Sequence, residues 1–240
     1  MKSGIIFTLH CKNRVLQRIG NNCKENYYKF VGFRIDEFLT WKHQLDYISS
    51  KIASAIFALN QVKHIVPIDI RKTIYNTLIK SHIEYGCMIL GTADAKNLAK
   101  INKLQKRAVR IVSNKKFLAH SDPIFASLKI LKLNDLIELN ICGFMHKHMN
   151  NNLPNSLRNL FTPLTTNNRN KSYRVEKPRI SILSNLPTVT FPKVWNSLPL
   201  NLKYSNSLSI LKNEMKANYY EKYREFKCSK ISCYACNSSK

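Results

Sequence analysis

Apolar positions along the chain change their spacing near residue 44. Before that point, polar and apolar residues alternate over residues 29–35 around a glycine, and residues 5–9 and 14–19 are short runs with strand composition. Alternation with a period of two is typical of β-strands. After that point, apolar residues recur at intervals of three and four, which places them on one face of an α-helix. The pattern therefore predicts a short β element followed by helices.

The helical spacing covers five segments. Asp69, Asn134 and Ser207 stand where the N-cap residues of three of them are expected. The expected helices cover residues 44–66, 69–84, 95–113, 134–148 and 207–223. Between the last two, residues 150–192 are rich in asparagine and proline and should be mostly irregular. Within this stretch, residues 180–183 and 189–191 are candidates for a small hairpin.

These elements predict an α+β fold that is mainly α. We expect a short N-terminal β element, a helical bundle, and a looser C-terminal module that contains the candidate hairpin. The expected divisions are residues 1–43, 44–118 and 119–227, with a cysteine-containing tail over 228–240.

Composition indicates a folded and strongly basic chain. The 240 residues are 44% hydrophobic and 10% aromatic, which is enough to form a sizeable core. Lysine and arginine number 39 against 14 aspartate and glutamate, and the formal net charge is +25. Charge of one sign at this level repels itself, so we expect a polyanion as the compensating partner.

Three features bear on where the protein resides. The apolar runs are too short for a membrane span or a secretory signal. Seven scattered cysteines, an odd number, indicate a reducing compartment. The first 24 residues are basic, as in a transit peptide, but residues 4–9 are rich in strand formers and favour a strand instead. We therefore expect an intracellular protein of the nucleus or cytoplasm, neither secreted nor bound to a membrane.

One face of the expected helix over 95–113 is strongly basic. Its cations recur at spacings of four, three, four and three, opposite the apolar face: Lys96, Lys100, Lys103, Arg107 and Arg110. The helix carries no glutamate that could neutralise them. Such a row can follow a phosphate backbone and release its counterions, whereas the alternative is a merely solvated face. We interpret it as a surface that contacts nucleic acid.

The chain offers no evident catalytic or metal centre. Two-metal nucleotidyl transfer needs converging carboxylates, and the sequence has no Asp-Asp pair. A closed zinc site needs four ligands, whereas the tail supplies three thiols, from Cys228, Cys233 and Cys236. These cysteines are weak zinc candidates, and free thiols are the favoured interpretation. We therefore expect no cofactor and no metal in this chain.

Several motifs follow one another in an order found in one family. They are KFVGFRID over 29–36, LTWKH over 39–43, ISSKI over 48–52, YNTLIKSHIEYG over 75–86, LQKRAVRI over 104–111, HSDPIF over 120–125 and VWNSLP over 194–199. In this order they resemble the segment after the catalytic palm of jockey-like non-LTR retrotransposon reverse transcriptases. That family reads K-F-L-G-V-x-I-D and L-Q-K-x-A-V-R-I at the corresponding places. The resemblance covers nearly the whole chain.

The resemblance implies a parent RNA-directed DNA polymerase that uses Mg²⁺ through palm aspartates. Those aspartates lie upstream of the segment that residues 2–7 resemble, so we expect them to be missing here. The resemblance places Phe30, Val31 and Gly32 on the primer-grip strand. It places the helices of 44–112 on the thumb, which packs along a template–primer duplex of RNA and DNA. The implied function is that of a C-terminal fragment that binds template–primer backbone at most.

Two departures and two alternatives accompany this interpretation. Leu90 stands where the family usually has tryptophan, and the family's His-x-Tyr-x-Thr-Arg stretch is eroded near 165–175, as in a decayed element copy. One alternative is a host-used helical protein that binds nucleic acid without any link to polymerisation. The other is a basic interaction module that binds an acidic protein.

Self-association or contact with the missing palm domain is also expected, because the strand of Phe30 would have lost its neighbours.

Overall fold

A two-stranded antiparallel sheet opens the part of the chain that the structure describes. The structure is a computed structural model, and it describes residues 27–36, 39–164, 171–179, 184–226 and 228. Strand β1 (Tyr27–Phe30) pairs with β2 (Phe33–Asp36). Val31 and Gly32 form the turn between them with φ of 44° and 79°. Positive φ at both turn residues matches the twist of a tight hairpin, so the alternating run over 29–35 is a hairpin and not one strand.

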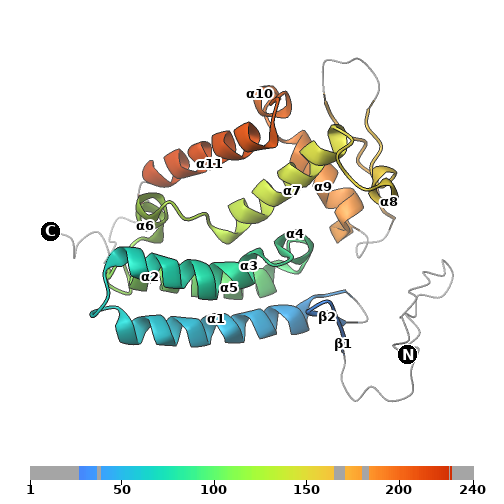
Figure 1. Cartoon of the computed structure of the whole chain (residues 1–240). Coiled ribbons are helices and arrows are strands. Elements are labelled where there is room, and N and C mark those ends of the chain that lie inside the picture. The colour runs from blue at the N-terminus through green and yellow to red at the C-terminus, as the bar shows by residue number, and fades with distance from the viewer. Residues whose placement is uncertain (1–26, 37–38, 165–170, 180–183, 227, 229–240) are drawn as a thin grey trace.

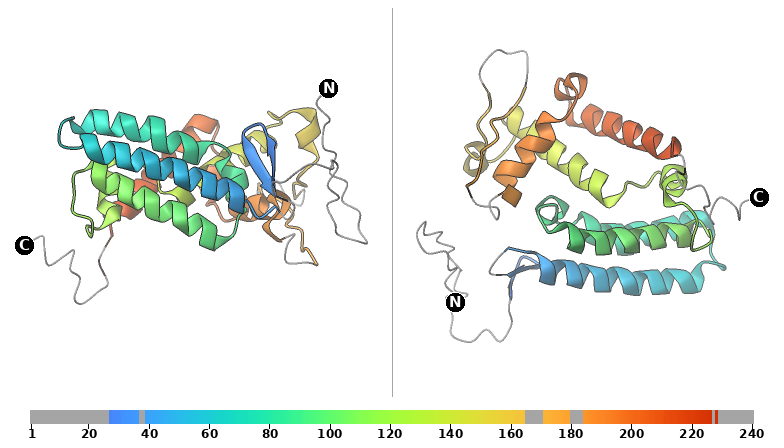
Figure 2. Two further views of the ribbon diagram at one scale, coloured as in Figure 1. Left: turned by 90° about the horizontal axis from the view of Figure 1, so that it is seen from below. Right: turned by 180° about the vertical axis from the view of Figure 1, so that it is seen from behind.

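Three helical segments, each antiparallel to the one before it, form the first half of the helical part (Figure 1). They are α1 (Lys42–Val62), a nearly continuous helix made of α2 (Ile68–Tyr75), the π-helical η1 (Asn76–Lys80) and α3 (Ser81–Glu84), and α5 (Ala95–Val112). The short α4 (Cys87–Leu90) precedes α5. Figure 2 shows α1, α2 and α5 side by side, and each packs against the other two. Their apolar faces, with Ile52, Tyr75 and Ala108 fully buried, form the core between them.

The second half packs around α7. Its helices are α6 (Ser121–Leu128), α7 (Leu133–Met149), α8 (Asn155–Arg158), α9 (Pro187–Asn196), α10 (Leu200–Lys203) and α11 (Leu208–Arg224). Helix α7 packs against α4, α9 and α11, and α11 also contacts α6 (Figure 1). The expected α+β fold, mainly α with a small N-terminal β element, is confirmed. None of the described helices has the length and apolar character needed to cross a membrane.

The expected small hairpin in the C-terminal module is wrong. Residues 189–191 lie inside α9, while residues 180–183 fall outside the described part of the chain. Pro187 occupies the first turn of α9, where its fixed φ favours a helix. Phe191 and Trp195 of α9 are buried in the core, so their packing outweighs the strand propensity of the Val-Thr-Phe run.

The three expected N-caps differ in outcome. Asn134 is not an N-cap, because α7 begins at Leu133 and Asn134 lies within its first turn. Ser207 caps α11, and its hydroxyl accepts a hydrogen bond from the backbone N–H of Ile210. Asp69 lies instead within the first turn of α2, which begins after Pro67. A carboxylate there still interacts favourably with the positive end of the helix dipole.

The hairpin is fixed against the bundle at the start of α1. The Asp36 carboxylate accepts hydrogen bonds from the backbone N–H groups of Thr40 and Trp41, at 2.8 and 2.9 Å. The Phe33 ring stacks on Tyr85 with centroids 4.9 Å apart. Beside them Gly86 has a φ of +66°, and a Cβ there would lie 1.9 Å from the Phe33 ring. The hairpin therefore has a defined position relative to the helices.

Candidate nucleic-acid interface

The outer face of α5 presents a row of exposed cations. Lys96, Lys100, Lys103 and Arg107 are exposed, as the sequence pattern predicts. The opposite side of the helix is buried against α1, α2 and α7 through Ile101, Gln105, Ala108, Val109 and Val112. The helix therefore separates a packed face from a positively charged face, and the charged face is open to solvent.

Lys100 differs from its neighbours because it has an acidic partner. Its Nζ lies 3.1 Å from Oδ1 of Asp46 on α1, and both side chains are about half exposed, at 54% and 47%. Water and salt screen such a pair, which holds Lys100 only weakly. Asp46 therefore lowers the net positive charge of the row at Lys100. Lys100 and Asp46 are 54 positions apart, so no local sequence pattern predicts their contact.

Arg110 is turned from the row toward the loop after α5. Its Nε donates a 2.7 Å hydrogen bond to the carbonyl oxygen of Ala119. Partial burial lowers the pKa of its guanidinium from the usual value. Arg71 of α2 makes a related contact, in which Nη1 donates to the carbonyl of Ile111. These arginines connect the loop and α2 to the end of α5, so Arg110 has a structural contact that the spacing alone did not indicate.

The tip of the β-hairpin is exposed and apolar. Phe30 and Val31 are 59% and 71% exposed. The Tyr85 hydroxyl donates a hydrogen bond to the carbonyl of Val31 and thereby stabilises the turn. At Gly32 an added Cβ would lie 3.3 Å from that hydroxyl, so the close approach and the positive φ both favour glycine. The hairpin and the first turn of α5 lie at the same end of the bundle (Figures 1 and 2).

The cysteine tail falls mostly outside the described residues. Cys228 is partly exposed with a free thiol, and Cys233 and Cys236 lie beyond the described part. Among the residues that the structure describes, no three histidine, cysteine or acidic side chains gather closely enough to hold a metal ion.

Comparisons with known proteins bear on the family. No family model and no solved structure matches the chain. The chain is 24% identical over 133 residues to "RNA-directed DNA polymerase from mobile element jockey" of Drosophila funebris, and 26% identical over 144 residues to the protein of that name from Drosophila melanogaster. The matched regions are 54% and 58% of this chain but only 14% and 16% of those relatives. The predicted relationship is thereby confirmed: the chain is related to the reverse transcriptases of jockey-type non-LTR retrotransposons.

Proposed function

We propose that this chain binds the sugar–phosphate backbone of an RNA–DNA template–primer duplex through the outer face of α5. The observation that carries the proposal is the row of exposed cations at Lys96, Lys103 and Arg107, on a helix without acidic residues. The relationship to RNA-directed DNA polymerases supports nucleic acid, among polyanions, as the partner.

The dimensions of α5 suit a phosphate backbone. At 1.5 Å per residue, Lys96 and Arg107 are separated by about 16 Å along the helix axis. One strand of a duplex presents about five phosphates over that length. Three or four cations can therefore each meet a phosphate without a base contact, which makes binding independent of sequence.

The proposal is confined to binding. Nucleotidyl transfer needs carboxylates that hold two metal ions, and the sequence contains no adjacent aspartates. The row on α5 supplies positive charge and position, which stabilise a bound duplex but activate no nucleophile.

Binding to duplexes of unrelated sequence tests this proposal. Fluorescence anisotropy on labelled RNA–DNA hybrids of about 20 base pairs should give affinities within about twofold for scrambled sequences, because phosphates carry no sequence information. The affinity should fall steeply with salt, by about 0.9 in log K per unit of log salt for each phosphate neutralised. A tenfold preference for one sequence, or an affinity that salt does not change, would contradict backbone binding.

The hairpin tip should contact the end of a primer. Stacking of a base on an aromatic side chain contributes about 1–3 kcal/mol, so Phe30→Ser should weaken binding of a duplex with a recessed 3′ end at least about fivefold. A blunt duplex should be affected less. The control is Phe57→Ser on α1, because that ring is 67% exposed and lies outside the hairpin. Equal losses for the two variants would show that Phe30 has no specific role at the primer end.

A further inference from the structure

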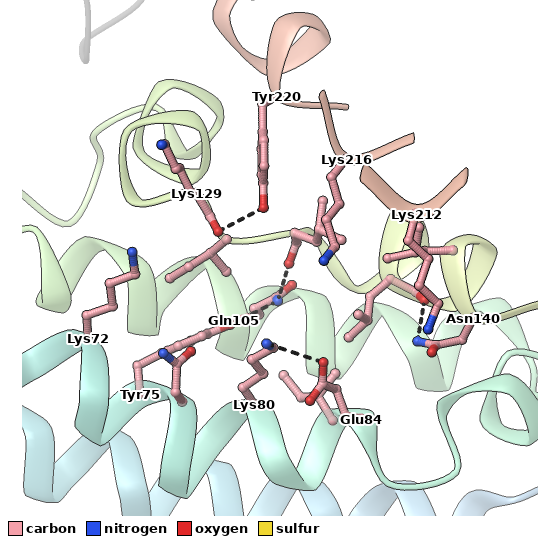
Figure 3. A pocket seen from close by; sticks show the side chains of 16 residues that line it. Lys72, Tyr75, Lys80, Glu84, Gln105, Lys129, Asn140, Lys212, Lys216 and Tyr220 are labelled. Carbon is pink, nitrogen blue, oxygen red and sulfur yellow. Dashed lines mark hydrogen bonds and ion pairs between the residues drawn. The ribbon is translucent and has the colours of Figure 1, made fainter. Parts of the chain in front are cut away.

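A second group of lysines lines a cavity on the other side of α5 (Figure 3). The cavity has a volume of about 270 Å³ and lies between α2–η1–α3, α7, α11 and the segment that follows α6. Its lysines come from three separate parts of the chain: Lys72, Lys80, Lys129, Lys212 and Lys216. The carboxylate in the lining that the structure describes is that of Glu84, which pairs with Lys80 at 3.3 Å.

This cavity is distinct from the basic row on α5. Gln105 of α5 contributes to its wall. Residues two positions apart in sequence are separated by about 200° around an α-helix. Gln105 is two positions from both Lys103 and Arg107, so it faces the opposite side of α5. A ligand in the cavity and a duplex on the outer face would therefore contact different sides of the same helix.

The π-helical turn aligns the first wall of the cavity. Lys72, Asn76, Lys80 and Glu84 all line it, at successive spacings of four. In a regular α-helix each such step rotates the side chain by about 40°, which would carry Glu84 far around the helix from Lys72. The wider turn of η1 rotates less per residue and offsets this drift. Single π turns of this kind are frequent at functional sites.

The opposite wall is held by α11 and α7. Gly143 on α7 lets the stem of Lys212 lie against the helix, because an added Cβ would be 3.0 Å from the Lys212 Cε. The Tyr220 hydroxyl donates a 2.9 Å hydrogen bond to the carbonyl of Lys129. These contacts place lysines of α11 and of the segment after α6 across the cavity from Lys72 and Lys80 (Figure 3).

The remaining lining favours strong electrostatic attraction. Ile83, Leu131, Leu136 and Leu139 give the cavity apolar walls, and charges act more strongly beside apolar groups than in open water. The Tyr75 hydroxyl accepts a hydrogen bond from Gln105 and can still donate its own proton. Lysines outnumber the one carboxylate of the described lining, and that carboxylate pairs with Lys80, so an anion would stabilise this arrangement.

We propose that the cavity binds an anion with two or more linked phosphate groups. Its volume corresponds to about nine water molecules, more room than a single phosphate needs, and its lysines approach from several sides. The phosphates could come from a free polyphosphate or nucleotide, or from the 5′-triphosphate end of a nucleic acid. Both sources present the same chemistry to the lysines.

Calorimetric titration of the 240-residue chain with inorganic tripolyphosphate tests the proposal. Replacement of Lys72, Lys212 and Lys216 by glutamine should weaken binding at least tenfold at near-physiological salt. The matched control replaces Lys147, Lys177 and Lys193, three exposed lysines outside the cavity, and should weaken binding less than about twofold. Equal losses in the two triple variants, or no binding of tripolyphosphate to the unmodified chain, would overturn the proposal.

The unfolding temperature distinguishes a binding role of these lysines from a structural role. The Lys72, Lys212 and Lys216 variant should unfold at a higher temperature than the unmodified chain, because repulsion in the cavity is relieved. A lower unfolding temperature would indicate that the lysines support the fold and would count against a binding site.

Two further ligands identify the source of the phosphates. If ATP competes with tripolyphosphate, while an oligonucleotide with a 5′-triphosphate binds no better than its 5′-hydroxyl form, the cavity takes a free small molecule. If the 5′-triphosphate oligonucleotide binds better than either, the cavity takes a nucleic-acid end. Both results support the proposal, provided that the cavity variant abolishes the difference. A difference that survives in the cavity variant would contradict it.

Discussion

Replacement of Gln105 by alanine is expected to lower the free energy of unfolding by about 3–5 kcal/mol. Gln105 is 2% exposed, and its Nε2 donates to the Tyr75 hydroxyl at 3.1 Å and to the Leu131 carbonyl at 2.9 Å. Its Oε1 accepts from the backbone N–H of Leu133 at 2.9 Å. One amide thus connects α2, α5 and the start of α7. Alanine would leave three buried polar groups without this partner, each at a cost of about 1–3 kcal/mol.

Urea unfolding followed by circular dichroism measures this loss. The control is Gln61→Ala on the exposed side of α1, which should change the free energy of unfolding by less than about 0.5 kcal/mol. A loss below about 1 kcal/mol for Gln105→Ala would mean that the connection between the helices does not depend on this side chain.

Simultaneous replacement of Lys96, Lys103 and Arg107 by glutamine is expected to weaken duplex binding roughly 100-fold at about 0.1 M salt. If each side chain neutralises one phosphate, the loss of three contacts at a slope of about 0.9 each corresponds to roughly 500-fold between 1 M and 0.1 M salt, so counterion release is sufficient for that factor. Glutamine keeps a high helix propensity, so α5 should remain intact. Lys100 is left unchanged, because its ion pair with Asp46 would complicate the comparison.

The matched control for this variant is again Lys147, Lys177 and Lys193, replaced by glutamine. It removes the same number of charges from exposed positions outside α5. If net charge alone attracted the duplex, the two triple variants would weaken binding alike. We expect the control to lose less than about threefold, because its lysines lie on α7, on α9 and on the segment before α9, outside the face of α5 that would hold the duplex.

Periodicity was sufficient to predict the main helices and the small β element. Apolar residues at intervals of three and four outline α1, α5 and α11, because each of these helices buries one face in the core. Helix α7 is buried on most sides, because it packs against α4, α9 and α11. The secondary-structure predictions that are wrong lie where tertiary packing overrides local propensity. Residues 189–191 read as a strand, but burial beside Trp195 selects a helix. The turn at Gly32 could not be recognised from the pattern, because polar and apolar residues alternate on both sides of it.

The candidate interface was predictable only in part. The spacing on α5 correctly placed Lys96, Lys103 and Arg107 on an exposed face, since they belong to one helix. The contact of Lys100 with Asp46 and that of Arg110 with Ala119 depend on neighbouring segments. The lysine-lined cavity was not predictable at all. Lys72, Lys129 and Lys212 lie far apart in sequence, and their approach results from the packing of α2, α6 and α11.

The salt dependence of duplex binding tests most directly whether α5 holds a nucleic-acid backbone. The slope of log K against log salt counts the phosphates that the protein neutralises. For the Lys96, Lys103 and Arg107 variant we expect a slope shallower by about three than that of the unmodified chain, and for the Lys147, Lys177 and Lys193 control an unchanged slope. Equal slopes for the unmodified chain and the α5 variant would contradict the account, because the duplex would then be bound elsewhere.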